Sequence, residues 1–133
     1  MPEPVRYLSL AWIDELTRQV AASEQMHAIA DRYAVGFTQV VTDGPEGEVA
    51  YHLVVGDGVA RFGAGPADPE DARFEQSWQT SSDLANGDLN ANTAFINGHI
   101  RMYGDQQKVL DSQPVFGALA AVFERVHEYT LYE

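Results

Sequence analysis

The chain has 133 residues and no cysteine, which excludes disulfides, thiolate metal sites and a cysteine nucleophile. Twenty acidic residues against eight basic ones give a formal charge of −12, which argues against binding to nucleic acid. No stretch approaches the roughly 20 apolar residues of a membrane span, and Met1 to Pro4 lack the basic start of a secretion signal. We therefore expect one cytoplasmic domain over residues 1–133, without a nucleic-acid partner or a membrane span.

The first segment, at about 9–33, has the periodicity of helix. Ser9 can cap a helix that begins at Leu10, and Trp12 lies at the margin of its apolar stripe. The stripe itself consists of Leu10, Ile13, Leu16 and Val20. A second helical piece follows a kink near Ser23.

The next segment alternates at period two, which predicts strands. Turn chemistry at 43–47 and 56–58, where glycine tolerates positive φ, separates the first three strands. An acidic loop at 65–71 precedes the fourth. We expect four strands joined as a meander, at about 35–42, 49–55, 59–62 and 73–78.

Residues 80–105 predict two short helices and a fifth strand. Thr80 and Asp83 have the spacing of a capping box, so we expect a helix to begin at Thr80 and to end at Gly87. A second helix would begin at Asn90, and residues 99–103 alternate like a strand.

The C-terminal part has a helical apolar stripe from Val115 to Val126, after a short helix interrupted by Pro114. Residues 128–133 would be a loosely held tail. The predicted fold class is α+β, with a five-stranded, mainly antiparallel sheet covered on one face by helices. The core of the domain would lie at about 35–126.

Three short segments carry a family signature. They are residues 84–89 (LANGDL), 94–98 (AFING) and 100–105 (IRMYGD). Their order and spacing resemble the sterol carrier protein type-two domain, and the resemblance extends more loosely over about 35–126. It implies a sterol-carrier-protein-like, lipid-binding fold without catalysis, which encloses an apolar cavity.

A search for chemistry finds no catalytic constellation. Residues 88–99 begin like a calcium loop, but Thr93 replaces the required glycine and His99 the bidentate glutamate. The four histidines have no metal-ligand spacing. We therefore predict no metal, no cofactor and no catalytic residue.

The aromatic and aliphatic side chains are more informative, because the fold would bring them together. An ordinary packed core explains each of them, whereas the family resemblance favours a cavity lining. The cavity candidates are Phe37, Phe74, Trp78, Phe95, Met102, Phe116, Leu119 and Phe123, with Phe62 in the wider apolar set. The polar cavity candidates are Gln39, His52, Gln76 and His99.

Three functions follow. The first is a carrier that binds a hydrophobic small molecule, and the glutamines favour a polar-tipped ligand such as a fatty acid or an oxygenated metabolite over a plain sterol. The second is an enzyme that cyclises or rearranges an apolar intermediate in the same cavity, with a polar cavity candidate as its reactive group. The third is a module that forms a homodimer through Trp12, Ile13 and Leu16 of the first helix.

Overall fold

A computed structural model describes residues 4–44, 47–85, 89 and 91–131, apart from four side chains, those of Ala85, Ala91, Asn92 and Phe95. The strands are β1 (Val5–Arg6), β2 (Val35–Gly44), β3 (Gly47–Gly56), β4 (Val59–Ala64), β5 (Ala72–Gln76), β6 (Ile100–Gly104) and β7 (Thr130–Leu131). The helices are α1 (Leu10–Ala22), α2 (Glu24–Ala30), α3 (Trp78–Ala85), α4 (Ala91–Ile96), α5 (Gln106–Asp111) and α6 (Gln113–His127). The α+β prediction with a five-stranded sheet is confirmed.

The main sheet has the strand order β4-β3-β2-β5-β6. All neighbours are antiparallel except β2 and β5, which are parallel, so the prediction of a four-strand meander is wrong. The chain leaves the edge strand β4 and passes over β3 and β2 before it forms β5. Parallel pairing requires such a crossover, and the loop at 65–71 supplies it.

The crossover loop lies on the face of the sheet opposite the helices. There the hydroxyl of the fully buried Thr38 accepts a hydrogen bond from the Ala67 N–H at 2.9 Å, and the Asp71 N–H donates to the Gly36 carbonyl at 2.7 Å. Gly36 permits this approach, because a Cβ built there would lie 1.9 Å from the Pro69 carbonyl oxygen. The loop therefore depends on a glycine in the strand beneath it.

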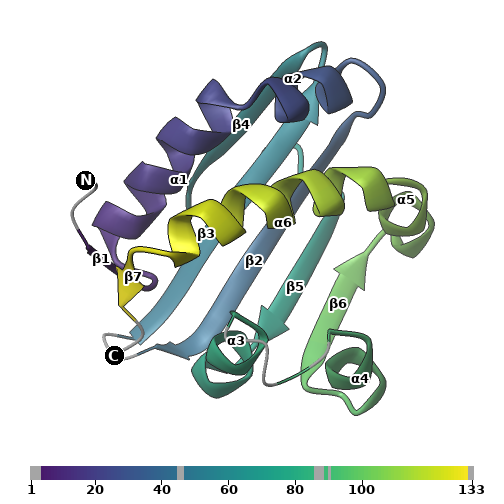
Figure 1. Cartoon of the computed structure of the whole chain (residues 1–133). Coiled ribbons are helices and arrows are strands. Elements are labelled where there is room, and N and C mark those ends of the chain that lie inside the picture. Colours follow the sequence, from purple (N-terminus) through teal and green to yellow (C-terminus); the bar gives the residue numbers. More distant parts are fainter. Residues whose placement is uncertain (1–3, 45–46, 86–88, 90, 132–133) are drawn as a thin grey trace.

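The helices cover the other face of the sheet (Figure 1). α1 and α2 lie over β4 and β3. α6 crosses the sheet and packs against both α1 and α2. α5 lies beyond the end of β6, whereas α3 and α4 lie at the opposite end of the sheet. The two layers thus pack closely along one side of the molecule, where three helices meet.

The core on that side is solid. Its fully buried side chains come from α1, α2, β3 and α6: Leu16, Val20, Met26, Leu53, Val122 and Val126. Trp12, predicted at the margin of the α1 stripe, is only 4% exposed, whereas Leu10, predicted within it, is 72% exposed. Trp12, Ile13 and Leu16 are buried in the chain's own core, so the dimer hypothesis loses the three side chains on which it rested.

The strand-to-helix junction after β5 differs from the prediction. α3 begins at Trp78, which was expected in the strand. The Ser77 hydroxyl accepts a hydrogen bond from the Thr80 N–H at 3.1 Å, and Asp43 Oδ1 accepts one from the Trp78 N–H at 2.7 Å. A capping side chain three residues earlier than expected thus moves the start of the helix. The predicted helix end at Gly87 and the start at Asn90 lie outside the described residues.

The C-terminal segment is paired and not a free tail, at least as far as Leu131. β7 runs parallel to β1, with Val5 opposite Thr130. The Val5 N–H donates to the Tyr129 carbonyl at 2.9 Å, and the Tyr7 N–H donates to the Leu131 carbonyl at 2.8 Å. β1 and β7 thus form a small second sheet, which the sequence did not indicate.

Candidate ligand pocket

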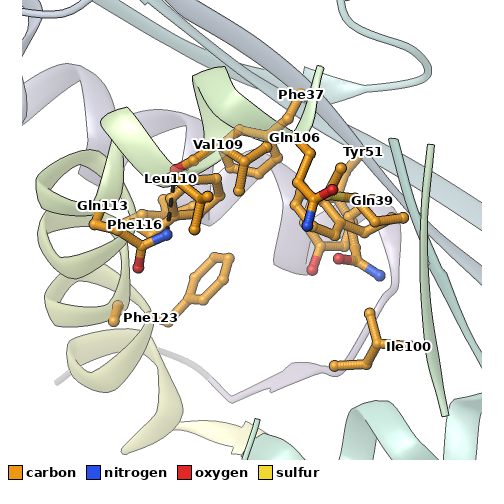
Figure 2. A pocket seen from close by; sticks show the side chains of 14 residues that line it. Phe37, Gln39, Tyr51, Ile100, Gln106, Val109, Leu110, Gln113, Phe116 and Phe123 are labelled. Carbon is orange, nitrogen blue, oxygen red and sulfur yellow. Dashed lines mark hydrogen bonds between the residues drawn. The ribbon is translucent and has the colours of Figure 1, made fainter. Parts of the chain in front are cut away.

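A pocket of about 440 Å³ lies between the sheet and helices α5 and α6, beside the solid core. This volume falls within the roughly 300–1,000 Å³ of sites that hold small molecules. The pocket is lined by Phe37, Gln39, Tyr51, Phe74, Ile100, Met102, Gln106, Val109, Leu110, Gln113, Phe116, Leu119, Ala120 and Phe123. Figure 2 shows these side chains around an open space, with Phe116 and Phe123 on the helix side and Gln39 and Ile100 on the sheet side.

The floor of the pocket is one cross-strand row. Tyr51, Gln39, Phe74 and Met102 are direct neighbours on β3, β2, β5 and β6. Because alternate residues of a strand share a face, this register aims all four toward the helices. Gln39 is the one amide in the row, between the rings of Tyr51 and Phe74.

The roof of the pocket comes from α6, which packs one apolar face against the core and turns another toward the pocket. Val115 and Val122 are completely buried against the core, whereas Phe116 and Phe123 are half-buried and face the pocket. The ring of Phe116 lies 4.7 Å from that of Phe37, which joins roof to floor at one end of the pocket. A broad apolar stripe thus lets one helix close the core and line a hollow.

The mouth is formed by α5. Asp105 caps this helix by accepting a hydrogen bond from the Lys108 N–H at 3.0 Å, and Lys108 Nζ pairs with Asp71 Oδ1 at 3.2 Å. The Asp105 N–H also donates to the Asp71 carbonyl at 2.8 Å. Gly104, at φ +105°, is required at this turn, because a Cβ there would lie 2.4 Å from the same carbonyl oxygen. Asp71 therefore anchors the helix from which Gln106, Val109 and Leu110 line the pocket.

The pocket has little capacity for acid–base chemistry. Of the lining residues that the structure describes, Tyr51 is the only titratable one, and burial raises its pKa well above 10. Its hydroxyl therefore stays protonated at neutral pH. Gln39 offers an amide, which donates and accepts hydrogen bonds but exchanges no proton near pH 7. The arrangement suits binding and orientation more than bond-making.

Six of the eight predicted apolar candidates line the pocket: Phe37, Phe74, Met102, Phe116, Leu119 and Phe123. Trp78 does not, because it opens α3 instead of continuing β5. The side chain of Phe95 lies outside the described residues. Phe62, from the wider set, is buried in the solid core.

Among the four polar candidates, only Gln39 lines the pocket. His52 points to the opposite face of the sheet, where its Nδ1 lies 3.0 Å from the Gly65 carbonyl oxygen, and His99 is exposed just before β6. Gln76 shares a sheet face with Phe74 but lies two residues further along, at the last position of β5, and does not line the pocket. The enzyme hypothesis thus loses both of its histidines.

Sequence reasoning missed seven lining residues: Tyr51, Ile100, Gln106, Val109, Leu110, Gln113 and Ala120. Four belong to α5 or to the junction with α6, whose orientation depends on the Asp71 anchor and not on local pattern. Tyr51 could have been found, since it shares a strand face with Leu53 in the alternation of β3.

No group of three or more histidine, aspartate or glutamate side chains among the described residues could hold a metal ion. None of the helices in that part of the chain is long and apolar enough to cross a membrane.

The fold and the pocket define an α+β domain with an open, mainly apolar pocket between its two layers. A family model for the SCP-2 sterol transfer family matches residues 13–117, and the chain therefore belongs to this family. The match begins in α1 and ends in α6, so it extends further toward the N-terminus than the resemblance over 35–126. Searching curated protein sequences gives no match.

Solved structures agree at the level of fold. A crystal structure of sterol carrier protein 2 is 19% identical and has a TM-score of 0.65, covering 93% of this chain and 99% of that one. A conserved hypothetical protein from Thermus thermophilus is 18% identical, with a TM-score of 0.64 and coverages of 97% and 93%. Apo sterol carrier protein 2 from Yarrowia lipolytica is 16% identical, with a TM-score of 0.62 and coverages of 83% and 88%.

Proposed function

We propose that this protein is a carrier that binds a hydrophobic small molecule between the sheet and helices α5 and α6, without chemistry of its own. The observation that carries the proposal is the pocket of about 440 Å³, whose wall contains four phenylalanines and Met102. Phe74, Met102, Phe116 and Phe123 are only half-buried. A bound ligand would complete the burial of these side chains. Each methylene group of the ligand that leaves water would contribute about 0.8 kcal/mol to binding, before the cost of ordering the ligand is subtracted. Membership of the SCP-2 sterol transfer family supports the same function.

The test is binding of an uncharged fluorescent probe, N-phenyl-1-naphthylamine, followed by displacement with dodecyl amphiphiles. We expect saturable fluorescence enhancement with one probe per chain. Native mass spectrometry of the purified protein would show whether a lipid is retained. If the probe does not bind and no lipid is retained, the proposal is wrong.

A pocket-filling variant localises the binding. Ala120 lines the pocket from α6, so Ala120→Trp would place an indole in the space that the ligand needs. We expect about tenfold weaker probe binding, equivalent to about 1.4 kcal/mol. Ala11→Trp is the matched control, because Ala11 is exposed on α1 and does not line the pocket. Equal effects of the two variants would contradict binding at this site.

A further inference from the structure

We propose that the pocket selects amphiphiles with an uncharged polar end that both donates and accepts hydrogen bonds, and that Gln39 makes this selection. Fatty amides, fatty alcohols and acylglycerols belong to this class, whereas ionised fatty acids do not. The inference rests on the proposed function, since it names the ligand class of the same pocket.

The first observation is the state of Gln39. Its amide lies at the centre of the floor row, flanked by Tyr51 and Phe74. Its only hydrogen bond within the described part of the chain is a long one, 3.4 Å from Nε2 to the Val40 carbonyl. The side-chain carbonyl oxygen and one N–H of Gln39 thus remain available to an occupant. A half-buried amide with unused capacity is costly unless a ligand or water satisfies it.

The second observation is the neighbouring hydroxyl of Tyr51. Tyr51 is 6% exposed, lies directly opposite Gln39 in the sheet register and lines the pocket. Because burial raises its pKa well above 10, the hydroxyl remains an O–H donor at neutral pH. Gln39 and Tyr51 together offer donors and an acceptor from adjacent strands. This combination matches a primary amide or a hydroxyl, which also has both functions.

The mouth repeats this chemistry. The amide of Gln106 has no partner within the described residues, and Gln113 Nε2 donates to the Val109 carbonyl at 3.2 Å, which leaves the Gln113 side-chain oxygen free. The Gln113 oxygen accepts a hydrogen bond from a ligand O–H or N–H, which an ionised carboxylate cannot offer, and the Gln106 amide can donate as well as accept. The entrance and the floor therefore favour the same uncharged group.

The third observation is the absence of a cation. Among the described residues that line the pocket, none is Lys, Arg or His. Lys108, the only lysine of the sequence, lies on α5 beside the mouth, but its Nζ pairs with Asp71 Oδ1 at 3.2 Å outside the pocket. A carboxylate would lose its hydration without gaining a counter-charge, which is strongly unfavourable in an apolar site. The formal charge of −12 on the chain adds to this penalty.

The experiment compares two ligands of the same length, dodecanamide and dodecanoate, as competitors of N-phenyl-1-naphthylamine at about pH 7.5, where the acid is ionised. We expect dodecanamide to bind about tenfold more tightly than dodecanoate. Gln39→Leu, which keeps the size of the side chain and removes its amide, should lower this ratio about threefold, because dodecanamide loses a hydrogen-bond partner while the missing counter-charge still disfavours dodecanoate. The uncharged probe should still bind to the variant, which verifies that the pocket is intact.

Gln107→Leu is the matched control, because Gln107 is exposed on α5 and its Nε2 donates to Asp111 Oδ1 at 2.9 Å outside the pocket. It should leave the ratio unchanged. Equal or tighter binding of dodecanoate to the unmodified protein would overturn the inference, as would an unchanged ratio in Gln39→Leu. Either result with normal probe binding leaves the carrier function standing, whereas failure of the probe to bind overturns both.

Discussion

The two sides of this molecule are both built from apolar residues, but one side forms a packed core and the other lines a pocket. On the filled side, α1, α2 and the inner face of α6 pack against β3 and β4, and Leu16, Val20 and Met26 are completely buried. On the open side, the outer face of α6 lies over the sheet and α5 lies beyond the end of β6, and Phe74 and Met102 remain half-buried around the pocket. Three helices meet on the first side, whereas the second has no helix in the place of α1. The filled side supplies stability, which permits a hollow beside it.

The largest expected effect tests the filled side. Leu16→Ala would remove a fully buried side chain from the packed core, so we expect a loss of about 3–5 kcal/mol in the free energy of unfolding. Urea denaturation followed by circular dichroism measures it. A loss below about 1 kcal/mol would mean that this core is no better packed than the open side.

A substitution on the open side should give the reverse pattern. Met102 is half-buried and faces the hollow, so Met102→Ala should cost about 1 kcal/mol of stability. Probe affinity should fall about tenfold, because the floor of the pocket loses an apolar contact. Urea unfolding measures the stability, and fluorescence titration of the same preparation measures the probe affinity. A stability loss as large as that of Leu16→Ala would show that the comparison is wrong.

The smallest effect concerns pH. The two ring nitrogens of His27, on the filled side, lie 2.7 Å from the Ala21 carbonyl oxygen and 3.1 Å from that of Gly58. Only the doubly protonated ring can donate to both, so the bonds to Ala21 and then Gly58 raise the pKa of His27, with a smaller contribution from Asp31. Its contribution to stability is complete below the unfolded pKa of about 6.5 and is lost as pH rises through the higher folded pKa.

Stability should therefore fall between about pH 6 and pH 8 more in the unmodified protein than in His27→Gln. Probe binding should not change over this range, because the described residues on the pocket wall carry no group that titrates there. Parallel urea titrations at the two pH values measure the first effect. Stability curves of equal slope for the two proteins would contradict the assigned role of His27.

The sequence was a good guide wherever local pattern determines structure. The alternation of residues in β2 and β3, the glycine turn at 56–58 and the apolar stripe of α6 lead directly to the observed elements. The order of strands was not accessible in this way, because a crossover from β4 to β5 depends on contacts such as Thr38 with Ala67, which are distant in sequence. The aromatic part of the pocket was predictable from local pattern. Phe37 and Phe74 follow the alternation of their strands, and Phe116 belongs to the apolar stripe of its helix.

The polar part of the pocket was not predictable, apart from Gln39. Gln39 and His52 both lie on strands whose residues alternate between the two faces of the sheet. The register places Gln39 on the face that the helices cover and His52 on the opposite face, and local pattern does not show which face carries the helices. Gln106 and Gln113 reach the pocket because the turn at Gly104 and the Asp71 anchor set the direction of α5. These are tertiary contacts, which no single window of sequence contains.

The most direct test of the comparison uses methionine as a probe of both sides. Met26 is completely buried on the filled side, whereas Met102 lies on the floor of the pocket. With ¹³C-labelled methionine methyl groups, assigned by Met26→Leu and Met102→Leu, titration with dodecanamide should shift the NMR signal of Met102 and leave that of Met26 in place. Equal shifts of both signals, or a shift of Met26 alone, would contradict the account of a hollow side beside a solid one.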